Sequence, residues 1–318
     1  MPSPHAPYLA CVPHVPFIAL QDRTLNAGFW AAYVEQAAAF RAYDPELVFV
    51  FGADHYDGQH MRLMPSFAVA LEAEAIADYG GYPGPLNVPI DVALPCAEYL
   101  IEQGFDIATS WAMEVDHGFS AVLHNIMGSI DARPVVPVFV NSLCHPRPTL
   151  RRCRQLGEAI GSFAKRLGKR VAFLGSGGLS HDTGPIFPQV HDLEPGPIRD
   201  YLIHGGRRGE LTRERWTADL NVGLDAVNAE LLARVPGVGD VRPAWDRRFL
   251  DLFATGDYEA FDSWKDADIL ANAGNGAGEI RQWIAAGAAA KAAGAGAVSI
   301  DYYDDDTPIA VAAVVVHA

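Results

Sequence analysis

Four histidines stand at positions where a side chain could bind a metal ion or transfer a proton, two tasks that suit imidazole near neutral pH. Three of them follow strand-like apolar runs or begin a loop: His14 in CVPHVP, His55 in VFVFGADHYDG and His181 in VAFLGSGGLSH. The fourth, His117 in MEVDHGF, follows Asp116 in a compact turn where a carboxylate could orient the ring. Because ligands of open α/β sheets collect at the carboxyl ends of strands, the four are candidates for one site.

These residues could also be structural histidines, part of a phosphate-binding loop or part of a hydrolytic triad. A single histidine near a strand end is more often a hydrogen-bonded structural residue or a surface residue. The segment GSGGLSH at 175–181 has neither the G-x-G-x-x-G spacing nor the lysine of a phosphate-binding loop. Its glycines instead predict a sharp backbone turn that points His181 into a cavity. No G-x-S-x-G motif occurs, which argues against Ser180 as the nucleophile of a hydrolytic triad.

The elements that must position these residues follow from the apolar pattern. Short runs rich in β-branched and aromatic residues predict buried strands at 47–51, 67–71, 135–140 and 171–174. Helical patterns lie at 25–43, 95–103, 121–128 and 150–167, and the Ala-rich stretch 284–298 predicts a packed helix followed by a turn. The alternation predicts an α/β fold with a central sheet covered by helices on both faces. We expect one domain over residues 1–318, with the mostly helical segment 185–264 packed on the same core.

Composition narrows the class of protein. The chain has 318 residues, of which 50% are hydrophobic, and a mean hydropathy of +0.06, as expected of a globular protein. Its formal charge of −15 disfavours nucleic acid and anionic membrane surfaces as partners. The four cysteines form no C-x-x-C pair, which indicates reduced thiols and a cytoplasmic location. The first twenty residues lack the pattern of a signal peptide, and no apolar run is long enough to span a membrane.

Six segments taken in order resemble the class III, LigB-type, extradiol ring-cleavage dioxygenases. They are CVPHVP, PELVFVFGADHYDG, VDHGF, GSGGLSH, WDRRFLDL and GEIRQWIAA, and the similarity runs from about residue 8 to about residue 290. The resemblance implies a LigB-type architecture with a central mixed sheet. It also implies a cytoplasmic homo-oligomer that acts on a catechol bearing a short carboxylic acid chain.

The resemblance implies that Fe(2+) is held by His14, His55 and Glu279, the last in GAGEIRQW. Two histidines and one carboxylate form a facial triad that leaves coordination positions open for a catechol and dioxygen. Taken without the family, Glu279 would be assigned to a helix surface. Asp246 in WDRRF is the rival carboxylate, since a short acid beside Trp245 could also face inward.

The resemblance also implies that His117 and His181 are the acid and base. We assign His181 as the base that deprotonates the diol and His117 as the proton donor, although the sequence permits the reverse. By adjacency, Asp116 is a candidate to orient His117, and Asp54 a candidate to orient His55. The implied reaction adds both atoms of O2 and opens the ring to a 2-hydroxy-6-oxo-dienoate.

Two questions stay open in the sequence. An anionic side chain on the catechol would need a basic partner, for which Arg247, Arg248 and Arg281 are the nearest candidates in sequence to the site motifs. The same ligand residues could also serve a zinc hydrolase or a non-catalytic metal-binding protein on this fold. The presence of both His117 and His181 favours the enzyme, because a binding module has no use for two further imidazoles.

Overall fold

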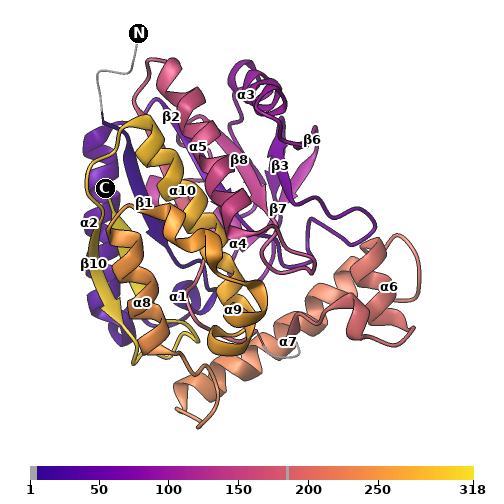
Figure 1. The fold of residues 1–318 in the computed structure, drawn as a ribbon. Coiled ribbons are helices and arrows are strands. Elements are labelled where there is room, and N and C mark those ends of the chain that lie inside the picture. Colours follow the sequence, from indigo (N-terminus) through magenta and orange to yellow (C-terminus); the bar gives the residue numbers. More distant parts are fainter. Residues whose placement is uncertain (1–5, 184–185) are drawn as a thin grey trace.

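The protein is built around a large mixed β-sheet (Figure 1). The structure is a computed structural model, and it describes residues 6–183 and 186–318. The strands of the sheet are β1 (Tyr8–Val12), β2 (Leu47–Gly52), β3 (Phe67–Ala70), β6 (Ala108–Ser110), β8 (Val135–Val140), β9 (Val171–Ser176), β10 (Ser299–Asp304) and β11 (Ala313–His317). Their order is β10-β11-β1-β9-β2-β8-β3-β6. A second sheet has the order β5-β4-β7, formed by β4 (Ala73–Ala75), β5 (Gly84–Pro85) and β7 (Met113–Val115).

The central four strands determine where a site can form. β1, β9, β2 and β8 pair in parallel, whereas β11 runs antiparallel to β1 and β3 antiparallel to β8. The carboxyl ends of four neighbouring strands therefore meet at one edge of the sheet. This is the edge at which open α/β proteins bind their ligands.

Both faces of the sheet are buried, as β2 illustrates. All six of its residues are buried. Phe49 and Phe51 join the apolar core on one face, and Val48 and Val50 join the core on the other. A continuous apolar run of this kind is typical of a parallel strand covered by helices on both sides.

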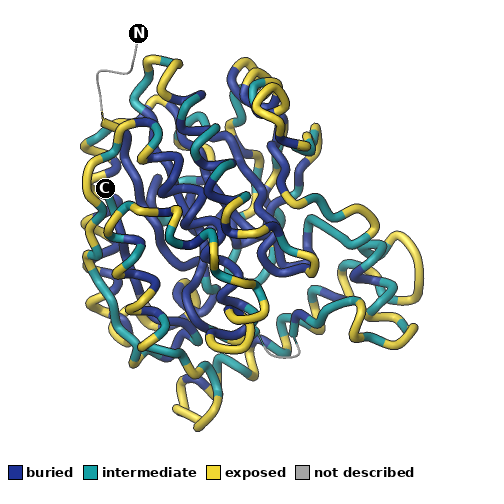
Figure 2. The backbone as a smooth tube through the Cα atoms, in the orientation of Figure 1, coloured by how far each residue is buried: buried dark blue, intermediate teal, exposed yellow. Residues whose placement is uncertain are grey.

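Helices cover these two faces (Figure 1). α5 and α10 contribute to one core, and α2 and α4 to the other. Figure 2 shows the buried backbone concentrated in the sheet and in the helices packed on it. The helices are α1 (Phe17–Leu20), α2 (Ala27–Tyr43), α3 (Ile90–Glu102), α4 (His117–Met127), α5 (Leu150–Arg166), α6 (Pro197–His204), α7 (Arg213–Leu232), α8 (Pro243–Ala254), α9 (Asp266–Ala273) and α10 (Ile280–Ala293). Short 3-10 turns are η1 (Arg23–Asn26), η3 (Val190–Asp192), η4 (Tyr258–Ser263) and η5 (Gly276–Glu279).

The structure confirms the α/β fold, the four expected strands and the helix in the Ala-rich stretch. The helix expected at 121–128 begins earlier, so His117 is the first residue of α4 and not part of a turn. Asp116 is the N-cap of that helix and accepts a hydrogen bond from the backbone N–H of Gly118. This cap explains the early start, because Asp satisfies an amide that would otherwise have no partner.

The segment 185–264 departs in part from the expectation of a shared core. α8 packs on the main core through Phe249 and Phe253, and α7 through Leu224. By contrast, α6 projects from the body (Figure 1) and belongs to a separate small cluster, in which Tyr201 stacks on Trp216 at 4.7 Å. The expectation was therefore wrong for α6, and residue 185 itself lies outside the described residues.

The cysteines and the apolar character of the helices can be compared with the expectations from composition. All four cysteines are free and buried. Within residues 6–183 and 186–318, no helix is long and apolar enough to cross a membrane.

Candidate metal centre and active site

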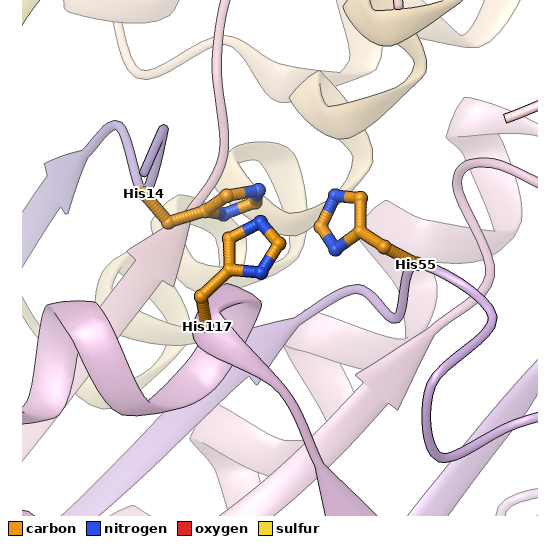
Figure 3. Close-up of side chains that lie close together, drawn as sticks. All are labelled: His14, His55 and His117. Carbon is orange, nitrogen blue, oxygen red and sulfur yellow. The ribbon is translucent and has the colours of Figure 1, made fainter. Parts of the chain in front are cut away.

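The structure brings all five candidate residues to one pocket at the carboxyl edge of the sheet. His14, His55 and His181 follow β1, β2 and β9, which are neighbours in the sheet. His117 begins α4, and Glu279 ends η5 immediately before α10. Three histidine rings point toward one another in Figure 3, with the His14 and His55 centroids 5.1 Å apart and those of His55 and His117 4.3 Å apart.

One carboxylate oxygen lies between two of these rings. Glu279 Oε1 is 3.1 Å from His14 Nε2 and 3.4 Å from His55 Nε2. The second oxygen, Oε2, accepts a hydrogen bond from the backbone N–H of Gly178 at 2.5 Å. Three donor atoms of the types that bind transition metals therefore converge on a small buried volume.

The other nitrogen of each ring is already engaged. His14 Nδ1 lies 3.0 Å from Ser176 Oγ, and the Ser176 hydroxyl donates its own proton to the carbonyl of Gly118. The Oγ atom must therefore accept the Nδ1 proton of His14. His55 Nδ1 lies 2.9 Å from the Asp116 carboxylate, which also acts as an acceptor. In both rings Nδ1 is engaged in this way and Nε2 faces Glu279, the arrangement that is common in metal-binding histidines.

The two remaining histidines are held in the same manner. His117 Nδ1 contacts the Asp78 carboxylate, which also accepts the backbone N–H of His117 at 3.0 Å. His181 Nδ1 donates to the carbonyl of Leu179 at 3.0 Å. Each ring therefore has Nε2 available for proton transfer within the pocket that both residues line.

Glycines provide the space that the His181 ring occupies. A Cβ atom on Gly276 would lie 2.1 Å from His181 Nε2, and one on Gly178 would lie 2.9 Å from His181 Cε1. Gly178 of GSGGLSH therefore leaves room for the ring, and His181 lines the pocket as the sequence predicts. Gly177 likewise lets the backbone approach Glu279, since a Cβ there would lie 2.8 Å from Glu279 Cβ.

The electrostatics favour an ionised carboxylate. Burial raises the pKa of Glu279, but the neighbouring His14 and His55 rings outweigh burial and hold this pKa well below its usual range. Burial lowers the pKa of His14. For His55 burial acts in the same direction, but the Asp116 and Glu279 carboxylates raise its pKa well above the ordinary value. A negative Glu279 in a buried site attracts a cation.

The carboxylate partners differ from those guessed by adjacency. Asp116 contacts His55 and not the His117 ring, for which the partner is Asp78. Asp54 accepts backbone N–H groups from Tyr56, Gly58 and Gln59 and so shapes the loop after β2. Asp78 lies in IADYGG, 39 residues before His117, and no pattern in the sequence marks it as a partner of that ring.

Asp246, the rival carboxylate, is buried behind the His181 loop. Its Oδ1 accepts the backbone N–H of Ser180 at 2.8 Å, and its Oδ2 accepts the Tyr303 hydroxyl at 3.2 Å. It is not among the described residues that line the pocket. The geometry therefore favours Glu279 as the carboxylate of the centre.

None of the three arginines considered for an anionic side chain lines the described pocket. Arg281 is buried and donates to two backbone carbonyls and to Asp266. Arg247 lies over the Tyr303 ring, and Arg248 over the Trp264 ring. These arginines stabilise the packing around α8 and α10.

Several donor sets in this cluster could hold an ion. Nitrogens of His14, His55 and His117 lie within 4.8 Å of one another. Glu279 adds an ionised oxygen in contact with two of those rings. A buried centre of histidines and carboxylate at the edge of an α/β sheet, with two more imidazoles at hand, defines a metal-dependent enzyme.

Comparison with known proteins identifies the family. Residues 8–316 match the family described as the catalytic LigB subunit of aromatic ring-opening dioxygenase, and the chain belongs to this family. It is accordingly an extradiol catechol dioxygenase.

Several relatives are named 2,3-dihydroxyphenylpropionate/2,3-dihydroxicinnamic acid 1,2-dioxygenase. One from Mycolicibacterium vanbaalenii is 40% identical over 300 residues, covering 93% of this chain and 92% of the relative. One from Pseudomonas putida, which carries the same name with the number 2, is 40% identical over 299 residues and 93% of each chain. One from Mycobacterium ulcerans is 39% identical over 273 residues, covering 86% of this chain and 85% of the relative.

Proposed function

We propose that this chain uses Fe(2+), held by His14, His55 and Glu279, to cleave a catechol bearing a short carboxylic acid chain. The model substrate is 2,3-dihydroxyphenylpropionate, and with O2 the product is a ring-opened 2-hydroxy-6-oxo-dienoate. The observation that carries the proposal is the convergence of two Nε2 atoms on one oxygen of Glu279, at 3.1 and 3.4 Å. The names of the relatives support the substrate.

The residues present fit an iron ion. Two imidazole nitrogens and one carboxylate are the donor set of non-haem Fe(II) oxygenases, and the Nδ1 contacts to Ser176 and Asp116 orient both Nε2 atoms toward Glu279. When bound, iron would supply a template for diol and dioxygen together with a route for electrons between them. Glu279 would offset part of the positive charge of the ion.

The protein's own part in the chemistry is proton transfer. We assign His181 as the base, since its Nδ1 donates to the neutral carbonyl of Leu179 and its Nε2 can accept a proton from the catechol. We assign His117 as the proton donor during ring opening. The carboxylate of Asp78 supports this role because it can compensate the charge of a His117 ring that carries an additional proton.

The direct test is anaerobic reconstitution with Fe(2+), followed by 2,3-dihydroxyphenylpropionate and air. We expect a yellow product and an equal consumption of dioxygen. Reconstitution with zinc is the control, because zinc cannot activate dioxygen by redox chemistry. Colour with another catechol only would contradict the substrate, and absence of colour and oxygen uptake with every catechol would contradict the reaction.

We also propose that the chain forms one catalytic domain, assembles as a homo-oligomer and is cytoplasmic. A single catalytic domain over residues 1–318 is supported by β1, which pairs with β11 from the other end of the chain. A homo-oligomer is supported by exposed apolar side chains such as Leu63, which is 84% exposed. The free cysteines support a cytoplasmic location.

A further inference from the structure

The pocket has an apolar end, which is formed by one face of α7. Three side chains of α7 form one wall: Leu220, Leu224 and Val227. Phe17, Phe187 and Val311 come from other segments and also line the pocket, and the Phe187 ring lies 5.3 Å from the His55 ring.

The wall formed by α7 follows from helical geometry. Leu220, Leu224 and Val227 stand at positions i, i+4 and i+7, so they share one face of the helix. Two contacts fix this face over the pocket. The hydroxyl of Tyr79 donates to Asp225 at 2.8 Å, and the amide of Gln21 donates to Asn228 at 2.8 Å.

The charged side chains that line the pocket are unsuited to an anion. Among the described residues that line the pocket there is no lysine or arginine, whereas Asp57, Asp78, Asp182 and Glu279 all line it. The nearby Arg242 is paired with Asp182 at 2.6 Å. A carboxylate at this end would lose hydration without gaining a cationic partner, which is unfavourable.

We propose that this end of the pocket selects an uncharged alkyl or alkenyl side chain, so that 3-alkylcatechols are the preferred substrates. The methylenes of 2,3-dihydroxyphenylpropionate then provide its binding energy, and its carboxylate is not a recognition element. This inference rests on the proposed cleavage of catechols, and it changes the preferred side chain from a carboxylic acid chain to an uncharged one. It follows from the α7 face and from the charges of the lining residues.

The first experiment compares substrates on the iron-loaded wild-type enzyme. From 3-methylcatechol to 3-propylcatechol we expect kcat/KM to rise about fourfold for each methylene. We expect 3-propylcatechol to equal or exceed 2,3-dihydroxyphenylpropionate. A higher kcat/KM for the acid than for 3-propylcatechol would overturn the inference while leaving ring cleavage intact.

A binding measurement separates this inference from the catalytic proposal. The compounds 2-propylphenol and 3-(2-hydroxyphenyl)propionate lack the diol and cannot be cleaved, so calorimetry reports their dissociation constants alone. We expect the neutral compound to bind at least as tightly, with a negative heat-capacity change from apolar burial. Tighter binding of the acid would overturn the inference even in a protein that cleaves no catechol.

A pair of variants locates the effect on α7. Leu220→Arg places a cation in the wall formed by α7. We expect it to raise the ratio of kcat/KM for 2,3-dihydroxyphenylpropionate to kcat/KM for 3-propylcatechol by about tenfold or more. Val222→Arg places the same side chain on the exposed face of the same helix and is expected to leave the ratio unchanged. Equal ratios in both variants, with both proteins folded by circular dichroism, would show that α7 does not contact the substrate side chain.

Discussion

Asp116 accepts two hydrogen bonds from His55, one from its backbone N–H at 2.6 Å and one from its ring Nδ1 at 2.9 Å. The carboxylate therefore fixes both the loop after β2 and the orientation of the imidazole. Its other oxygen caps α4 through the N–H of Gly118, the residue after His117. One buried side chain thus links the metal-binding ring to the helix that carries a candidate proton donor.

We predict that Asp116→Asn weakens metal affinity about 10- to 100-fold, the range found for outer partners of metal-bound histidines. The reason is that an amide is a poorer acceptor for the Nδ1 proton of His55. Competition with a chelator measures the affinity. Asp251→Asn, on the exposed side of α8, is the matched control and is expected to bind metal as the wild type does.

Replacing the carboxylate of the centre is predicted to have a larger effect. Glu279→Gln keeps an acceptor for the N–H of Gly178 but removes the charge, so metal affinity is expected to fall by more than about 100-fold. Asp246→Asn changes the rival carboxylate, which contacts Ser180 and Tyr303, and is expected to keep a full complement of metal. The metal content of both variants after dialysis decides between the two carboxylates. Loss of metal from Asp246→Asn, with metal retained by Glu279→Gln, would make Asp246 the ligand.

The imidazoles assigned to proton transfer are predicted to be separable from metal binding. His181→Ala and His117→Ala are each expected to retain iron while turnover falls about 10²- to 10⁴-fold. His14→Ala is the contrasting variant and is expected to lose both iron and turnover. The measurements are metal content and the initial rate of dioxygen uptake. Loss of iron in His117→Ala would instead indicate the three-histidine donor set.

Asp246 is predicted to make the stability of the protein depend on pH. Burial raises the pKa of its carboxyl to about 6, above that of an unfolded chain. The folded state favours the neutral acid, whereas the unfolded chain ionises at lower pH. The free energy of unfolding is therefore highest below about pH 4 and falls as the pH rises to about 6. Between pH 4 and pH 6 the free energy of unfolding of the wild type is expected to fall by about 2 to 3 kcal/mol relative to that of Asp246→Asn, as measured by urea unfolding. A constant difference between the two proteins would contradict this.

The sequence predicts the fold best where strands are covered on both faces. The apolar run at 135–140 matches β8 at both ends, because every residue of that strand is buried. The edge strand β10 was not predicted, because SIDYYD is partly exposed and contains two acidic residues. β1 is short and is followed at once by a proline, so its signal is also weak.

The site could be predicted only in part, for a different reason. The strand ends mark His14, His55 and His181, and the family resemblance supplies Glu279. The contacts of Asp78 with His117 depend on how the loop after β4 folds back on α4, which no local pattern encodes. The apolar face of α7 has helical spacing in the sequence, but the spacing does not reveal that the face covers a pocket.

The same substitution in two helices is predicted to have opposite effects on stability. A Cβ on Gly161 of α5 would lie 2.1 Å from the backbone oxygen of Ala289 in α10, so Gly161→Ala must separate two tightly packed helices. We expect it to lower the free energy of unfolding by about 1 to 3 kcal/mol. Gly223 of α7 has no atom within 4 Å of such a Cβ, so Gly223→Ala is expected to raise the free energy by up to about 1 kcal/mol. Urea unfolding of both variants tests the contrast, and destabilisation by both would show that α7 has less free space than the structure indicates.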